Sequence, residues 1–165
     1  MKYHPITKEI TDLLGKNGCW FETFVHEPVR TSEEAAKVRN GYSLKQGAKA
    51  LIVRFKNPSG EKKFVMVVMS GDLKFDKRKL KNFLGVKDLS LAAEDEVEDI
   101  TRGVKIGGVP PFGNLFNLEV LADKSLFENE KIIFNAGDRC FSVAMKSDDY
   151  KNLVKPTICD IGAKQ

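Results

Sequence analysis

A glycine- and proline-rich stretch stands out among the segments that could bind a ligand. Residues 106–113 read IGGVPPFG, with three glycines and two prolines. Glycine lets a ligand approach the backbone closely, while proline fixes φ and removes an N–H donor, so we expect a stiff loop. A stiff loop with exposed amides can hold a carbonyl or an oxyanion in a fixed place. The composition is also typical of a tight connection between strands, and the spacing matches neither a P-loop nor a dinucleotide-binding loop.

Lys49 and His26 are two further side chains that could act on a substrate. Lys49 directly precedes the apolar run ALIV at 50–53, so we expect its ammonium to be partly buried and directed into a cleft. A desolvated lysine can bind a carboxylate, phosphate or carbonyl, or become a nucleophile. Taken alone, a lysine at a strand edge more often extends to water. His26 ends a predicted strand, where it could be a base or a substrate contact, or could bond to the backbone.

Basic residues gather on and just before a helix that is predicted to begin at Asp76. They are Lys74, Lys77, Arg78, Lys79 and Lys81. They belong to a wider asymmetry, because residues 1–90 contain 18 Lys or Arg against 10 Asp or Glu, whereas residues 91–165 contain 9 against 13. Such a surface can position a phosphate backbone. A solvated helix face explains the cluster equally well.

Alternating helices and strands must position these residues. Helical spacing and capping signals predict helices at 6–15, 31–40, 76–84, 94–100 and 147–154, with Thr31, Asp76 and Ser147 at their N-termini. Apolar, β-prone runs predict strands at 20–26, 50–55, 64–69, 119–121, 131–134 and 141–145. The sequence NPSG predicts a turn between the second and third strands. We therefore predict an α/β (α+β) fold with a mixed, largely antiparallel sheet flanked by helices.

Length and composition exclude several classes of protein. With 165 residues, 42% hydrophobic and 30% charged, the sequence indicates a single globular domain over residues 1–165. It contains neither an apolar run of about 20 residues nor a secretory signal. Three scattered cysteines and two histidines argue against a disulfide framework and a metal site. Cys140 has no histidine close in sequence and is predicted to be a buried strand cysteine. We expect a cytoplasmic protein without a cofactor.

Taken together and in this order, these motifs resemble the YbaK/ProX family of aminoacyl-tRNA editing domains. The resemblance runs from about Trp20 to Val154. It is carried by HEP at 26–28, TSEEAA at 31–36, Lys49, SGD at 70–72, KL at 79–80, FLG at 83–85, Thr101, Gly103, GGVPPFG at 107–113 and NAG at 135–137. The lysine combined with the Gly-x-x-x-Pro loop, Gly107 to Pro111, is the most specific part of the pattern.

The resemblance implies an activity and a site. Such domains hydrolyse the ester that joins a wrong amino acid to a tRNA 3′ end, most often of tRNA(Pro), without a metal or cofactor. This sequence resembles a free-standing, trans-acting member whose partners are tRNA and prolyl-tRNA synthetase, with no membrane. Lys49 would be the electrostatic anchor, and the Gly107 and Gly108 amides would bind the carbonyl or oxyanion. The other implied substrate contacts are Phe24, His26, Thr31, Val109, Pro110, Pro111, Phe112, Gly113 and Ser142.

The substrate and the activity each leave alternatives open. Thr31 and Ser142 are small and hydroxylated, which favours a small amino acid such as Ala, Ser, Thr or Cys. An ester is already activated, so positioning, oxyanion stabilisation and a ribose hydroxyl that orients water would suffice without a catalytic triad. A non-catalytic tRNA- or synthetase-binding module with the same fold is the main alternative. An esterase for small molecules, independent of RNA, is a third interpretation.

Overall fold

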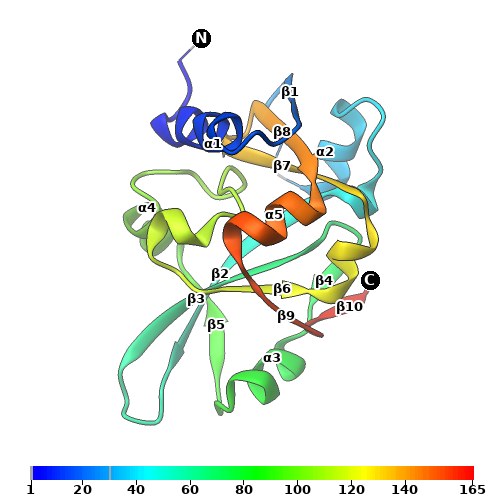
Figure 1. The fold of residues 1–165 in the computed structure, drawn as a ribbon. Helices are drawn as coiled ribbons and strands as arrows, with labels where there is room; N and C mark the ends of the chain where they lie inside the picture. The colour runs from blue at the N-terminus through cyan, green and yellow to red at the C-terminus, as the bar shows by residue number, and fades with distance from the viewer. Residues whose placement is uncertain (1, 30) are drawn as a thin grey trace.

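A computed structural model describes residues 2–29 and 31–165 (Figure 1). Its helices are α1 (Pro5–Lys16), α2 (Ser32–Val38), α3 (Lys77–Leu84), α4 (Glu94–Ile100) and α5 (Ser147–Val154), with 3-10 helices η1 (Leu44–Gln46), η2 (Gly113–Phe116) and η3 (Lys124–Glu128). Its strands are β1 (Phe21–Val25), β2 (Ala48–Lys56), β3 (Lys62–Ser70), β4 (Leu73–Phe75), β5 (Leu89–Leu91), β6 (Val120–Asp123), β7 (Lys131–Asp138), β8 (Phe141–Lys146), β9 (Thr157–Cys159) and β10 (Gly162–Lys164).

Two sheets form the centre of the molecule. The larger has the order β5-β2-β3-β6-β9, in which β2 is antiparallel to β3 and β5 while β6 is parallel to β3 and β9. The smaller, β1-β8-β7, is antiparallel throughout. An isolated bridge between Gly47 and Ile133 joins them. The predicted mixed, largely antiparallel architecture is thereby confirmed.

Helix α1 lies at the opposite end of the molecule from α3 and the β2–β3 hairpin (Figure 1). At its own end α1 packs along β7. The central strand β3 is buried from Val65 to Ser70, as its continuous apolar sequence predicts for a strand covered on both faces. Ala48, Met66 and Val68 face one core cluster, whereas Val53 and Met69 face another on the other side of the sheet.

The predicted helix ends are mostly present. The Thr31 hydroxyl accepts the Glu34 N–H at 3.1 Å, and the Asp76 carboxylate accepts the Lys79 N–H at 3.0 Å. Gly85 ends α3 with φ +68°, a conformation that glycine adopts without strain. The prediction for Ser147 was wrong. This residue is the first of α5 rather than its cap, because its buried hydroxyl donates to the Asn129 carbonyl at 2.5 Å.

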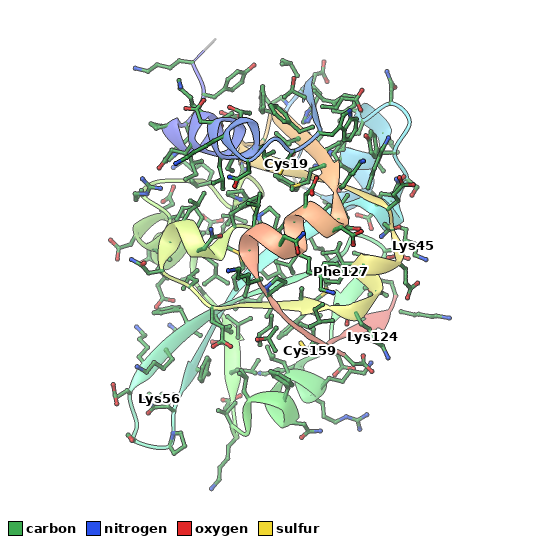
Figure 2. All side chains as sticks on the ribbon, viewed as in Figure 1. Cys19, Lys45, Lys56, Lys124, Phe127 and Cys159 are labelled. Carbon is green, nitrogen blue, oxygen red and sulfur yellow. The ribbon has the colours of Figure 1, made fainter. Side chains whose placement is uncertain are left out.

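Four short strands, β4, β5, β9 and β10, lie outside the predicted set. Each has three residues, too few for a periodic signal. Cys140 is also placed differently from the prediction, in the turn between β7 and β8 and only partly buried. Cys19 and Cys159 lie far from each other in the view of Figure 2, and all three thiols are unpaired.

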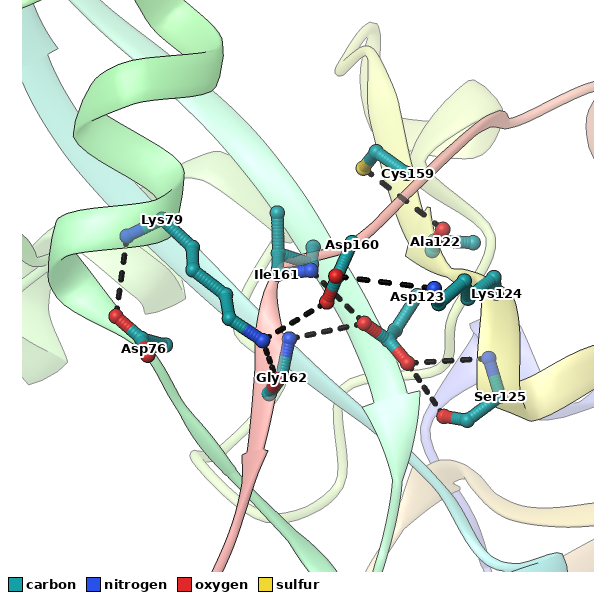
Figure 3. Close-up of polar contacts among 10 residues, drawn as sticks. All are labelled: Asp76, Lys79, Ala122, Asp123, Lys124, Ser125, Cys159, Asp160, Ile161 and Gly162. Carbon is teal, nitrogen blue, oxygen red and sulfur yellow. Dashed lines mark hydrogen bonds and ion pairs between the residues drawn. The ribbon is translucent and has the colours of Figure 1, made fainter.

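The Asp123 carboxylate holds the C-terminal strands against the larger sheet (Figure 3). This side chain is 3% exposed. One oxygen accepts the N–H groups of Ile161 and Gly162 at 2.8 and 2.9 Å, and the other accepts from the amide and hydroxyl of Ser125. Burial alone raises the pKa of this group, but these hydrogen bonds outweigh it and lower the pKa below its usual range. The charged carboxylate therefore positions β10, which pairs with β4.

We expect Asp123→Asn to lose about 1.5–3 kcal/mol of unfolding free energy at pH 7, because an amide cannot replace a carboxylate that accepts four hydrogen bonds. Since the folded-state pKa is lowered, the difference from wild type is present above the usual pKa range of aspartate and disappears as the pH falls through the lowered value. Urea denaturation at several pH values measures it.

The neighbouring Asp160 supplies a matched control. It is exposed and pairs with Lys79 at 2.9 Å and Lys124 at 3.7 Å. Surface ion pairs contribute about 0–1 kcal/mol, so Asp160→Asn should change stability little. Equal losses for both variants would contradict the role assigned to Asp123.

Candidate active site

A cavity of about 180 Å³ opens where the two sheets diverge beyond the Gly47–Ile133 bridge. Its floor is the edge of β2, from Gly47 to Leu51. One wall is formed by α2 and the residues at its two ends. Thr31, Ala35 and Arg39 follow one another at a spacing of four residues and so lie on one face. The opposite wall is the Gly107 loop with Asn135 of β7. An engineered cavity of about 150 Å³ holds a benzene molecule, so this one suits an amino-acid side chain rather than a nucleoside.

Lys49 lies in this cavity at the start of β2, half-buried as predicted. Its ammonium donates to the Leu73 carbonyl of β4, which fixes its position. Burial lowers the pKa of Lys49 below its usual range, while the negative charges of Glu33 and Asp72 act in the opposite direction. The result is a cation held at the edge of the cavity with part of its hydration removed.

The loop after Lys105 is held from one side by β7 and the β7–β8 turn. The Ile106 carbonyl accepts from Arg139 Nε and the Gly107 carbonyl from Asn135 Nδ2, both at 2.7 Å. The Gly108 carbonyl accepts the Gly137 N–H at 2.8 Å. In a trans peptide the next N–H points away from the carbonyl, so the amides of Gly107 and Val109 point away from the groups that hold the loop.

The three amides of this loop therefore differ in availability. Within residues 2–29 and 31–165, the N–H groups of Gly107 and Val109 have no hydrogen-bond acceptor. Both residues line the cavity. The Gly108 N–H, expected to be an oxyanion donor, instead donates to the Lys105 carbonyl at 2.9 Å. Gly107 is the member of the expected glycine pair that keeps a donor available next to the cavity.

Arg39 is a feature of the site that sequence reasoning missed. Its side chain is 7% exposed and lines the inner part of the cavity. Nε donates to Ser142 Oγ and Nη2 to Asn135 Oδ1, both at 3.0 Å. Burial lowers the pKa of Arg39 to about 10, so the guanidinium is still charged at neutral pH. A basic residue in the last turn of a helix is ordinary in sequence, which is why no signal marked it.

Other expected contacts lie outside the lining of the cavity. His26 is engaged by the Glu27 carbonyl at 2.8 Å and by Ser142 Oγ at 2.7 Å, so both ring nitrogens have partners. Ser142 is buried and is linked to the cavity lining through Arg39 and Asn135, to whose Oδ1 it donates at 3.0 Å. Phe24, on β1, packs edge-on against Tyr42.

The second half of the loop serves the core. Pro110, Pro111, Phe112 and Gly113 are buried. Phe112 packs against Phe134 and Tyr150, and the Tyr150 hydroxyl donates to the Pro111 carbonyl at 2.6 Å. A Cβ atom on Gly113 would lie 2.5 Å from Val120. These residues anchor the loop instead of lining the cavity. The Cys140 thiol has a pKa raised by burial and by Asp138, so it is not an activated nucleophile.

The predicted basic cluster is partly neutralised. Lys77 and Lys81 face Asp88 at 3.4 and 3.9 Å, and Lys79 pairs with Asp160. Lys74 and Arg78 have no ion pair within the described part of the chain. A second hollow, of about 860 Å³, lies between the end of α3 and the hairpin. Lys56 and Lys87 add positive charge there, whereas Arg54 and Lys62 pair with Glu96 at 3.0 and 3.1 Å. Lys56 marks this hairpin in Figure 2.

No helix among the described residues is long and apolar enough to cross a membrane. The same residues contain no group of three or more His, Cys, Asp or Glu side chains arranged to hold a metal ion.

Comparisons with known proteins agree with this geometry. The sequence model of the aminoacyl-tRNA editing domain matches residues 26–153. The Multifunctional Ser/Thr-tRNA deacylase ProXp-y of Escherichia coli is 35% identical over 147 residues, which cover 88% of this chain and 86% of that protein. The Prolyl-tRNA editing protein ProX of Acetoanaerobium sticklandii is 30% identical, with 79% of each chain covered.

The fold has a close counterpart among solved structures. A crystal structure of a candidate trans-editing enzyme for prolyl-tRNA synthetase superposes with a TM-score of 0.80 at 22% identity, covering 98% of this chain and 99% of that one. The two-sheet fold matches that of this neighbour, and the editing-domain sequence model covers most of the chain. The chain belongs to the aminoacyl-tRNA editing domain family and is an aminoacyl-tRNA hydrolase.

The glycine loop yields a prediction that separates backbone strain from function. Gly107 has φ +92°, and a Cβ atom there would lie 3.2 Å from Arg139 Nε. We expect Gly107→Ala to cost about 1–3 kcal/mol of stability and to lower kcat/KM about 10²-fold, because the loop would shift at the cavity. Thermal unfolding and deacylation assays measure the two effects.

Gly60, in the hairpin turn, is the matched control. It has φ +82° and open space around its Cβ position. Gly60→Ala should show a comparable loss of stability with unchanged deacylation. If both variants retained full activity, the loop would have no role in positioning the substrate.

Proposed function

We propose that this protein acts in trans on tRNA(Pro) that carries a small wrong amino acid, and hydrolyses its ester. Serine and threonine are the favoured substrates, with alanine and cysteine as further candidates. The observation that carries the proposal is the cavity of about 180 Å³ that brings Lys49, Thr31, Gly107 and Arg39 together. The relationship to a Ser/Thr-tRNA deacylase over 86% of that protein's length supports the amino-acid assignment.

The tRNA assignment rests on the relatives. A protein described as a prolyl-tRNA editing protein matches over 79% of its length, and the Proline--tRNA ligase of Caldicellulosiruptor saccharolyticus contains a segment 29% identical that makes up 23% of that ligase. These relationships support tRNA(Pro) as the substrate and prolyl-tRNA synthetase as a partner. The basic surface of α3 and the hairpin would contact the tRNA backbone, mainly through cations that lack an ion pair.

The chemistry that we propose needs positioning more than proton transfer. The tRNA terminus would lie at the exposed mouth of the cavity, with the ester between Lys49 and the Gly107 N–H. That N–H would donate to the carbonyl oxygen as negative charge develops on it. Lys49 would stabilise the same charge or the adjacent phosphate. A hydroxyl of the terminal ribose would orient the attacking water, so that no side chain has to act as a strong base.

A panel of mischarged tRNAs tests the activity directly. The purified protein should release serine and threonine from tRNA(Pro) faster than proline, measured as loss of the radiolabelled ester. Absence of hydrolysis for every member of the panel, together with salt-sensitive tRNA binding, would favour a non-catalytic tRNA-binding module. Hydrolysis of simple amino-acid esters at the same rate with and without tRNA would favour a small-molecule esterase.

Lys49→Met tests the role of Lys49 as electrostatic anchor, and it should lower the activity without lowering the stability. We expect kcat/KM to fall at least about 10²-fold, because a charge that faces the ester is lost. The melting temperature should stay equal or rise, because the variant removes a cation that burial disfavours. The Leu73 carbonyl keeps a donor, Gln165 Nε2 at 3.3 Å.

Lys16→Met, at the end of α1, is the matched control. Lys16 is exposed and lies at the end of the molecule away from α3 and the hairpin, so its replacement should leave deacylation unchanged. Full activity in Lys49→Met would remove Lys49 from the site.

A further inference from the structure

Arg39 has donors that the protein itself does not use. Its Nε and Nη2 atoms donate to Ser142 and Asn135. Its third nitrogen, Nη1, has no hydrogen-bond acceptor among residues 2–29 and 31–165, and it lies 3.6 Å from the Cβ position of Gly47 in the cavity lining. No carboxylate of those residues lies within 4 Å of the guanidinium. Three of the five guanidinium N–H groups are therefore unused, two of them on Nη1. Nη1 is reached by solvent at the cavity, and a ligand that covers it has to accept from it or leave a donor unpaired.

The burial of the lining residues gives the cavity a direction. Thr31, Ile106 and Gly107 are exposed and form its mouth, whereas Ala35, Arg39 and Ala48 are 4%, 7% and 6% exposed and form its inner end. The ester is joined to a tRNA, which has to stay outside. The part of the substrate that extends deepest is therefore the side chain of the amino acid.

The inner end has the chemistry of a hydroxyl site. Arg39 offers N–H donors, and the small apolar side chains of Ala35 and Ala48 leave room beside them for a methyl group. The α-carboxylate of the amino acid is consumed in the ester, and its ammonium group is repelled by a guanidinium. In the small substrates of the proposed function, serine and threonine, the oxygen acceptor that enters with the side chain is the hydroxyl.

On the basis of the proposed function, we propose that Arg39 is the specificity residue that recognises the side-chain hydroxyl of serine or threonine through its Nη1 donors. Ser142 and Asn135 are positioning residues, because they hold the guanidinium in the plane in which Nη1 faces the cavity. A substrate with an apolar side chain would leave these buried donors unpaired and would be disfavoured at the same site.

The test compares substrates within each variant. We measure kcat/KM of the full chain on tRNA(Pro) charged with serine, threonine or alanine. Arg39→Met should lower the ratio of serine to alanine by about 10- to 100-fold, because a hydrogen bond to a charged donor is lost for serine alone. Arg39→Lys, which keeps the charge and one donor, should lower the ratio less. Ser142→Ala, which releases Arg39 Nε, should lower it by a smaller factor than Arg39→Met.

A purely structural role of Arg39 would give a different pattern. It would reduce activity on serine, threonine and alanine by the same factor, and that result, or an unchanged ratio, overturns the proposal. If a thermal melt shows that Arg39→Met is not folded, the ratio of kcat/KM for serine to that for alanine in Arg39→Lys decides between the two roles. Lack of activity of the wild-type protein on all three substrates would contradict the proposed function instead, so the two failures are distinguishable.

Discussion

The site depends on one constraint in the fold. The same edge of β2 lies next to the smaller sheet where the strand begins and next to β5 of the larger sheet where it ends. The first edge of β2 pairs with β3 along its whole length. Beside its second edge, Gly47 bridges to Ile133 of β7 just before β2 begins, and pairing with β5 runs only from Val53 onward. Between these points, within the described residues, this edge of β2 has no strand pairing. The cavity is this unpaired stretch of edge, closed by α2 on one side and by the glycine loop on the other.

Gly47 makes that constraint possible. A Cβ atom at this position would lie 3.2 Å from the Leu44 carbonyl and 3.6 Å from Arg39 Nη1. The absence of a side chain therefore lets the chain pass close to the Leu44 carbonyl where β2 begins, while the guanidinium stays at an ordinary contact distance. Because side chains alternate along a strand, Lys49 points to the opposite face of the sheet from Ala48, toward β4. One strand thus places a cation on one side of the cavity and leaves small side chains on the other.

Both cations of the site are disfavoured by burial, and the fold compensates for them elsewhere. Lys49 and Arg39 each have a pKa lowered by desolvation. The Asp123 carboxylate, by contrast, has a lowered pKa because its hydrogen bonds favour the charged form. It holds β10 against β4, and β4 supplies the carbonyl that positions Lys49. The stabilising charge of Asp123 thus supports β4, and β4 restrains the cation of Lys49, which burial destabilises. Such a loss of stability at the site itself is common where a protein binds a ligand.

What could be predicted from the sequence depends on how far apart along the chain the interacting residues lie. The caps at Thr31 and Asp76 and the β2–β3 hairpin depend on neighbouring residues, and they were predicted. Lys49 and the glycine loop were recognised through their resemblance to a family, not through periodicity. Arg39 was missed because its burial depends on Ser142 and Asn135, about a hundred positions away. The neutralisation of Lys79 by Asp160 is hidden for the same reason.

Asn135 joins the two walls of the cavity, which explains how a site without a catalytic triad can be rigid. Its Oδ1 accepts from Arg39 Nη2 and its Nδ2 donates to the Gly107 carbonyl. These partners fix the orientation of the amide, since reversing it would place like groups against each other. In the proposed mode of binding, the donors for the side chain and the donor for the ester carbonyl are thereby set in one frame. Hydrolysis of an activated ester depends mainly on such preorganised geometry. Asn135 takes no part in the proposed reaction, but its two hydrogen bonds determine how accurately Arg39 and the Gly107 loop are placed.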